Sequence, residues 1–146
     1  MLIWINGPFG VGKTATAYEL NRRLPGSVVC DPAHVGFGMH RMLPPSLRGN
    51  FQDIPAWRTA VKELLSRTLR ECDAPVIVPM TLVKPGYFQE IIGSLRDEGF
   101  DVQRDAERWR AVLTGPGAPN GLVAGLHYLV KDQHVSDPHA PVIAIQ

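Results

Sequence analysis

The chain has 146 residues, of which 45% are hydrophobic, and its formal net charge is +1. This length suits one domain with one core, and the hydrophobic content argues against wholesale disorder. The charge forms no basic stripe or acidic tail, so nucleic acid is not expected as a partner. No apolar run approaches the length of a membrane span and no secretory signal is evident, so we expect a cytoplasmic protein.

The first elements alternate between strand and helix. Leu2–Ile5 is short, apolar and not alternating, which is typical of a buried parallel strand. A helix is expected over residues 13–24, where Ala17, Leu20 and Leu24 share one face and a Pro-Gly pair ends it. The next strand is expected over residues 27–30.

A long connection follows over residues 33–50, which are rich in Gly, Pro, Met and His. We expect it to be partly irregular, with a short helix around residues 38–42, and such connections are often functional. Asp53 is expected to cap the next helix, with Pro55 in its first turn. Helical spacing of apolar and small residues makes this the clearest helix of the chain: Trp57, Ala60, Val61, Leu64, Leu65, Thr68 and Leu69.

A third buried strand is expected over residues 75–80, and a further helix from Pro85 to Gly99. Alternating strands and helices predict a parallel sheet covered by helices on both faces. In the helix predicted from Pro85, the apolar face is formed by Phe88, Ile91, Ile92 and Leu95. Weaker signals predict strands at 100–102 and 141–145, helices at 105–113 and 122–130, and a turn-rich loop at 115–121.

The strongest functional signal is G-x-x-x-x-G-K-T at residues 7–14, the P-loop or Walker A motif, set between a strand and a helix. Its glycines let backbone N–H groups surround a polyphosphate, and the helix adds its positive N-terminal end. Lys13 is expected to bridge the outer phosphates, and the Thr14 hydroxyl to bind Mg²⁺. We therefore predict that ATP and Mg²⁺ bind at Gly7, Phe9, Gly10, Val11, Gly12, Lys13, Thr14 and Ala15.

Missing motifs narrow the class. The chain has no N-K-x-D for guanine and no D-x-x-G after the third strand, which weighs against a GTPase, and it is too short for a motor core. What remains is the three-layer P-loop NTPase fold of nucleoside- or nucleotide-kinase type. In that architecture a five-stranded parallel sheet binds the donor at the P-loop and the acceptor across the carboxyl ends of the strands.

Because Met80-Thr81 ends the third strand, the best acid near the P-loop is Asp31, after the second strand. Asp31 either accepts the acceptor's hydroxyl proton or holds Mg²⁺ through water, or it caps a turn or helix beginning at Pro32. Arg58 either contacts an anionic group or is a solvated helix-face arginine. The same choice, between acceptor contact and an ordinary packing or surface role, applies to Phe9, His34, His40 and Arg41.

Cys30 and Cys72 lack C-x-x-C or zinc-site spacing, so we predict reduced, buried thiols. Trp4 and Trp57 are predicted to lie in the core.

Beyond the P-loop, the chain resembles the tunicamycin resistance proteins. The likeness covers about residues 1–102 and rests on the run at 3–14, on Asp31-Pro32, on Trp57-Arg58 and on residues 78–81. It implies an ATP-binding, kinase-like α/β fold and a role in resistance to a nucleoside antibiotic. After Val102 the family continues with a full fourth strand, an Arg-rich helix and a lid, whereas here Gln103-Arg104-Asp105 follows at once.

We therefore expect residues 1–146 to form a single P-loop kinase-like domain, with residues 103–121 as a lid or a rebuilt region. The leading hypothesis is an ATP-dependent phosphotransferase in which Lys13, Asp31 and Arg58 act on a nucleoside-like or sugar-nucleotide-like small molecule. The alternative is a nucleotide-dependent protein that sequesters the drug unchanged. The acceptor and the oligomeric state are not predicted.

Overall fold

Three short strands form one parallel sheet in the computed structural model, which describes residues 1–6, 9–10, 12–100 and 102. The strands β1 (Leu2–Ile5), β2 (Val28–Val29) and β3 (Val76–Pro79) lie in the order β1-β3-β2. On the other edge of β1, Leu2 forms an isolated parallel bridge with Val102, which lies within the strand predicted at residues 100–102. The loop at 115–121 and the elements predicted after residue 102 fall outside the described residues.

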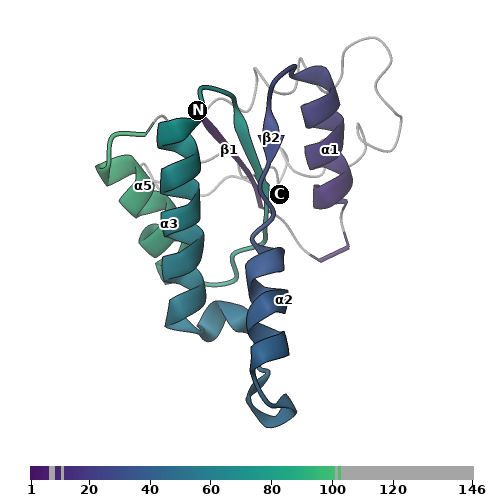
Figure 1. Cartoon of the computed structure of the whole chain (residues 1–146), viewed down its shortest axis with the longest axis vertical. Helices are drawn as coiled ribbons and strands as arrows, with labels where there is room; N and C mark the ends of the chain where they lie inside the picture. The colour runs from purple at the N-terminus through teal and green to yellow at the C-terminus, as the bar shows by residue number, and fades with distance from the viewer. Residues whose placement is uncertain (7–8, 11, 101, 103–146) are drawn as a thin grey trace.

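Helices cover both sides of this sheet, as the sequence predicts. Figure 1 shows α1 on one side, α3 and α5 on the other, and α2 running away from the sheet. After β3, residues 85–97 form a continuous helical stretch that changes from α to π geometry and back. The helices are α1 (Lys13–Arg23), α2 (Ala33–Met42), α3 (Pro55–Glu71), α4 (Pro85–Phe88), the π-helical η3 (Gln89–Gly93) and α5 (Ser94–Asp97), with 3₁₀ turns η1 (Pro45–Leu47) and η2 (Phe51–Asp53).

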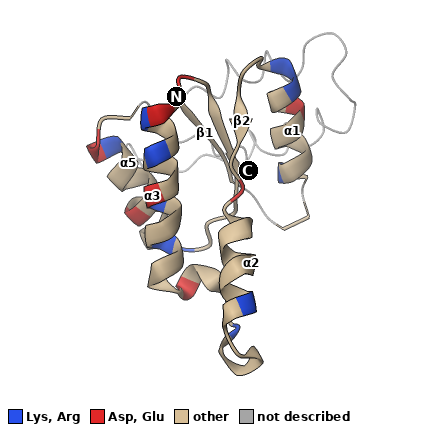
Figure 2. Ribbon diagram, viewed as in Figure 1, with Lys and Arg blue, Asp and Glu red and all other residues tan. Residues whose placement is uncertain are grey.

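Surface ion pairs brace the outer helices, whose charged residues are marked in Figure 2. On α1, Arg22 and Arg23 both donate to Glu19, and these hydrogen bonds lower the pKa of that carboxyl to about 2. Between α3 and α5, the Arg70 guanidinium lies 2.6 Å from the Glu98 carboxylate. Such exposed pairs contribute little each, so the fold depends mainly on its core.

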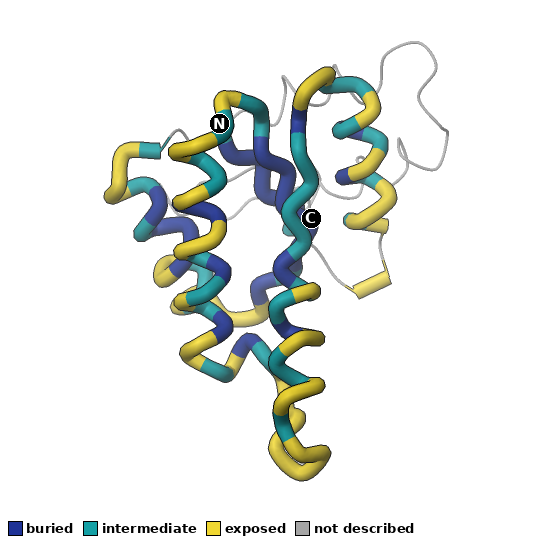
Figure 3. The backbone as a smooth tube through the Cα atoms, in the orientation of Figure 1, coloured by how far each residue is buried: buried dark blue, intermediate teal, exposed yellow. Residues whose placement is uncertain are grey.

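The two sheet faces carry separate cores because strand side chains alternate. Leu2 and Trp4 of β1 pack with α3 and η3, whereas Ile3 and Ile5 pack with Ala17 and Leu20 of α1. Figure 3 shows β1 and β3 as the most deeply buried elements and the far end of α2 as exposed. The predicted core faces are confirmed at Trp57, Val61 and Leu65 of α3 and at Ile91, Ile92 and Leu95.

The connection after β2 is more regular than predicted. In place of a short helix at 38–42, α2 already begins at Ala33. Val35 and Met39 pack against the α3-side core, and this burial offsets the low helix propensity of Gly36 and Gly38. Tertiary packing therefore extends a helix that local propensity alone does not indicate.

Three further expectations were wrong in detail. Asp53 does not cap α3, because its carboxylate instead accepts hydrogen bonds from Lys84 and Tyr87, which lower its pKa. Leu64 is 54% exposed rather than on the buried face of α3. Cys30 and Cys72 are free thiols, as predicted, but only half-buried.

Candidate nucleotide-binding site

The described part of the P-loop has the backbone that an anion site needs. Gly10 and Gly12 have φ values of +81° and +88°, which residues with a Cβ rarely adopt. Gly12 precedes α1 as its N-cap, and among the described residues no side chain caps this helix end. Its first N–H groups therefore remain suited to a phosphate. Gly7 and Val11 lie outside the described residues.

Lys13, in the first turn of α1, lies beside one residue proposed for the same site, Phe9, and feels the charge of another, Asp31. Its Nζ is 5.6 Å from the centroid of the Phe9 ring, and Phe9 is 81% exposed, so a packing role for Phe9 is wrong. Partial burial lowers the pKa of Lys13, while the negative charge of Asp31 acts in the opposite direction. The structure thus brings Phe9 and Lys13 together, Asp31 acts electrostatically on Lys13, and Thr14 and Ala15 are exposed.

Asp31 has the turn-capping contact that the sequence leaves open, and its catalytic or Mg²⁺-holding role stays a prediction. Its Oδ1 accepts a hydrogen bond from the Ala33 N–H at 2.9 Å, which stabilises the turn into α2. The negative charge of Asp31 also acts on Lys13, where it opposes the lowering of the lysine pKa. Capping the turn uses one oxygen of the Asp31 carboxylate and does not depend on its negative charge. The charge therefore remains available for a role at the site.

Buried side chains hold the loops at the carboxyl edge of the sheet. The Trp4 Nε1–H donates to the Met80 carbonyl at 2.8 Å, and the Trp57 Nε1–H donates to the Pro32 carbonyl at 3.1 Å. Both tryptophans are fully buried, as predicted, but their role in fixing loop backbone was not predicted. Asn6 adds a third such bond by accepting the Leu82 N–H at 2.8 Å. The position of Asn6 directly after β1 is the sequence feature that could have indicated this role.

Gln52 is a buried polar residue that sequence reasoning did not single out for the site. Its Nε2 donates to the Thr81 carbonyl at 2.5 Å, and its Oε1 accepts the Val83 N–H at 3.3 Å. Gln52 therefore joins η2 to the loop after β3. The hydrophobic periodicity of the sequence does not indicate this role of Gln52, because η2 is too short to show a periodic pattern.

Arg58 is mostly buried rather than solvated. Its side chain is 12% exposed, and it donates to the Gln52 carbonyl at 2.6 Å and to the Glu90 carboxylate at 2.5 Å. Its guanidinium also lies 4.3 Å from the centroid of the Tyr87 ring. These partners belong to η2, α4 and η3, and none is in the P-loop, so the solvated-surface interpretation of Arg58 is wrong and its catalytic role stays a prediction.

The polar residues of α2 divide between its two faces. His40 contacts the Gly49 carbonyl at 3.0 Å and the Phe51 ring at 5.6 Å, so it helps to close the end of α2. His34 and Arg41 are exposed.

The chain belongs to the AAA domain family, a group of P-loop proteins that includes kinase-like domains, because residues 2–108 match the sequence profile of that family. A particular likeness is to the tunicamycin resistance protein of Deinococcus radiodurans, with 34% sequence identity and a TM-score of 0.60. That match covers 70% of this chain and 60% of the other, so the chain spans less than two thirds of that protein. The resemblance to tunicamycin resistance proteins and the P-loop kinase-like fold are thereby confirmed. No curated protein sequence matches the chain significantly.

Within the described ranges, no helix is both long and apolar enough to cross a membrane. The same residues contain no group of three or more His, Cys, Asp or Glu side chains that could hold a metal ion.

Proposed function

We propose that this protein binds ATP with Mg²⁺ and transfers a phosphoryl group to a hydroxyl of a nucleoside-like antibiotic such as tunicamycin. The observation that carries the proposal is the P-loop backbone before α1, with positive φ at Gly10 and Gly12 and with Lys13 in the first turn of the helix. Asp31, shortly after β2, supports it, because its negative charge acts on Lys13. A cation for the donor phosphates and a carboxylate for the acceptor hydroxyl are the two groups that such a transfer needs close together.

The residues present fit ATP. The positive φ values of Gly10 and Gly12 leave their backbone open, and a Cβ added to either glycine would meet no atom within 4 Å. The N–H groups at the start of α1 and the Lys13 ammonium supply positive charge, and the Thr14 hydroxyl is exposed for Mg²⁺. Partial burial of Lys13 costs free energy that a bound polyphosphate offsets, since an anion favours the charged amine.

ATP supplies the γ-phosphoryl group and ADP as leaving group. Asp31 orients the acceptor hydroxyl and takes its proton as the oxygen–phosphorus bond forms. Lys13 stabilises the charge that spreads over the transferred phosphoryl oxygens. Arg58, held by Glu90 and Gln52, is proposed to steady the acceptor side of the site through its positive charge.

Sequestration of the drug without chemical change is a second candidate. One observation favours it: β3 ends in Pro79, followed by Met80 and Thr81, so no carboxylate stands at that strand end. Kinases of this architecture often have a second acid near the metal, and its absence here lowers the chemical capacity of the site.

Mass spectrometry of tunicamycin incubated with the protein and Mg-ATP separates these functions. A mass gain of one phosphate is expected, and a retained but unchanged drug would indicate sequestration. Lys13→Ala should weaken ATP binding in calorimetry and abolish the product while the melting temperature is kept. An unchanged ATP affinity in the folded variant would refute nucleotide binding at this P-loop.

A further inference from the structure

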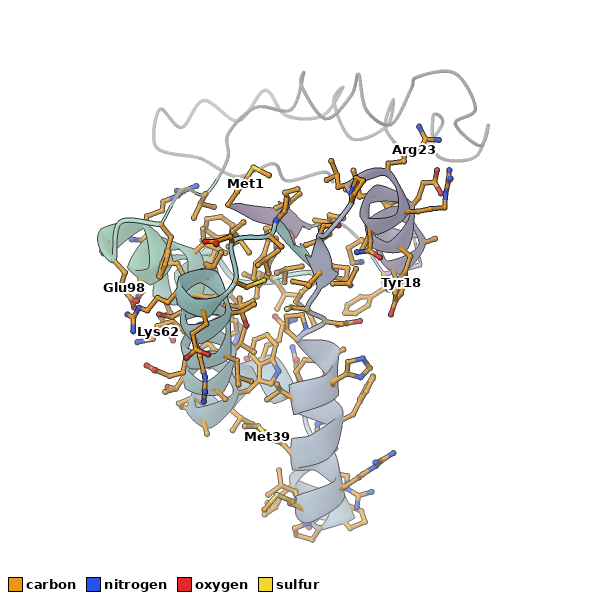
Figure 4. All side chains as sticks on the ribbon, turned by 45° about the horizontal axis from the view of Figure 1, so that its top comes forward. Met1, Tyr18, Arg23, Met39, Lys62 and Glu98 are labelled. Carbon is orange, nitrogen blue, oxygen red and sulfur yellow. The ribbon has the colours of Figure 1, made fainter. Side chains whose placement is uncertain are left out.

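The two faces of α2 have different surroundings. Val35, Gly36, Met39 and His40 face α3 and η2, and Figure 4 shows Met39 directed toward α3. The opposite face has the spacing i, i+3, i+4, i+7, and its four residues are all exposed. We call this set the outer face of α2; it consists of His34, Phe37, Gly38 and Arg41.

Phe37 is the exposed end of a row of aromatic rings that starts in the core. The fully buried Trp57 ring lies 5.3 Å from that of Phe51, which lies 6.2 Å from that of Phe37 in an edge-to-face arrangement. Gly36 permits this packing, because a Cβ there would lie 2.5 Å from the Phe51 ring. Phe37 is therefore a supported aromatic surface that is still 55% exposed.

Gly38, beside Phe37, has no packing reason to be glycine. A Cβ at this position would meet nothing within 4 Å, and its φ is not in the left-handed region. Glycine in a helix interior is less favourable than alanine, so glycine at this exposed position weakens α2. No packing contact within the protein compensates for that loss. The glycine does, however, leave room for a flat group to approach the helix.

Charge and position favour one kind of occupant. Residues 33–49 contain Arg41 and Arg48 but no Asp or Glu, so this region offers hydrogen-bond donors to an oxygen-rich ligand. Within the described part of the chain, the Arg41 side chain makes no hydrogen bond or ion pair. At about 1.5 Å per residue, Gly38 lies roughly 8 Å along α2 from Ala33. Asp31 precedes that helix by two residues, so the base of a nucleoside at Gly38 is separated from Asp31 by about the length of the nucleoside.

We infer that the outer face of α2 binds the planar, carbonyl-bearing base of a nucleoside acceptor. The base lies over Gly38 against the Phe37 ring, Arg41 donates hydrogen bonds to its carbonyl oxygens, and the sugar extends past His34 to Asp31. This inference rests on the proposed function and adds to it the surface that holds the base of the nucleoside and the residues that select it. A sugar without a planar base lacks the Phe37 contact and binds more weakly.

The test maps ligands on the full chain by amide chemical shifts. Wild type is titrated first with Mg²⁺ and the non-hydrolysable analogue AMP-PNP, and then with tunicamycin or uridine. Calorimetry on Phe37→Ala and Gly38→Leu then measures the affinity for the nucleoside probe. The matched control is Gly86→Leu, since Gly86 is the glycine of α4 and likewise has open space around its Cα.

Nucleoside shifts are expected to concentrate at residues 34–41. Phe37→Ala and Gly38→Leu should each raise the nucleoside Kd about tenfold, as for a lost base–aromatic contact, with AMP-PNP affinity and melting temperature kept. Gly86→Leu should bind as wild type does. Shifts that map elsewhere, unchanged Kd in both outer-face variants, or no binding of either nucleoside would overturn the inference. Failure of wild type to bind AMP-PNP would instead refute the proposed function.

Discussion

Replacing Asp31 by asparagine and by alanine separates its two roles. Its Oδ1 accepts the Ala33 N–H at 2.9 Å, and asparagine keeps an oxygen acceptor there while removing the charge. Alanine removes the acceptor as well, which costs about 0.5–2 kcal/mol at the start of a helix. We therefore expect the asparagine variant to unfold within roughly 0.5 kcal/mol of wild type, and the alanine variant to be less stable.

Both substitutions remove the carboxylate whose charge acts on Lys13. Phosphoryl transfer should fall by about 10²-fold or more in each, the usual scale for a lost general base. The Lys13 pKa should fall further, because the charge of Asp31 is the effect that raises it.

Urea denaturation and single-turnover kinetics with Mg-ATP, on the same preparations, measure the two effects. An asparagine variant with wild-type stability and full transfer activity would refute the catalytic role. An asparagine variant as unstable as the alanine variant would show that the charge, and not the hydrogen bond to α2, stabilises this turn.

Three further outcomes follow from the contacts. Gln52→Leu keeps the side-chain volume but removes the hydrogen bonds of a buried side chain, so it should lower the free energy of unfolding by roughly 1–3 kcal/mol in urea denaturation. An unchanged midpoint would contradict this. Gly36→Ala should lower the free energy of unfolding by roughly 1–2 kcal/mol, because its Cβ would collide with Phe51, whereas the matched Gly38→Ala should not lower it. Equal urea midpoints for the two variants would show that α2 moves to make room for the Cβ. Burial lowers the Lys13 pKa, so ATP affinity should decline as the pH rises toward 10.5 and the amine loses its proton. The Lys13→Arg variant keeps its charge over this range and serves as the control. If ATP affinity changes with pH in the same way in both proteins, deprotonation of Lys13 is not the cause of the decline.

The elements that sequence predicts well are those where local pattern and burial agree. Leu2–Ile5 has the predicted bounds because a continuous apolar run after Met1 leaves little choice of register. The same agreement holds for Trp57, Val61 and Leu65 of α3. The π-helical segment Gln89–Gly93 could not be predicted, because its widened turn depends on how Ile91 and Ile92 both reach the core rather than on residue type.

The candidate site was predictable only in its backbone motif. A P-loop needs glycines at fixed spacing, so Gly10, Gly12 and Lys13 are visible in the sequence itself. The contacts of Arg58 and Gln52 join segments far apart in the chain, and no local pattern encodes such a pairing. The extent of α2 was also missed, because its glycines conceal a helix that packing against α3 stabilises.

The pairing of β1 has a consequence for synthesis of the chain. Leu2 pairs with Val76 on one side and with Val102 on the other, so β1 has no strand partner until β3 has been made. At typical translation rates that interval is on the order of ten seconds, far longer than a helix needs to form. During it the apolar β1 is an unpaired edge, which is the kind of segment that aggregates or recruits a chaperone. We expect the anion-binding loop that follows β1 to become ordered only late in folding, when β3 closes the sheet.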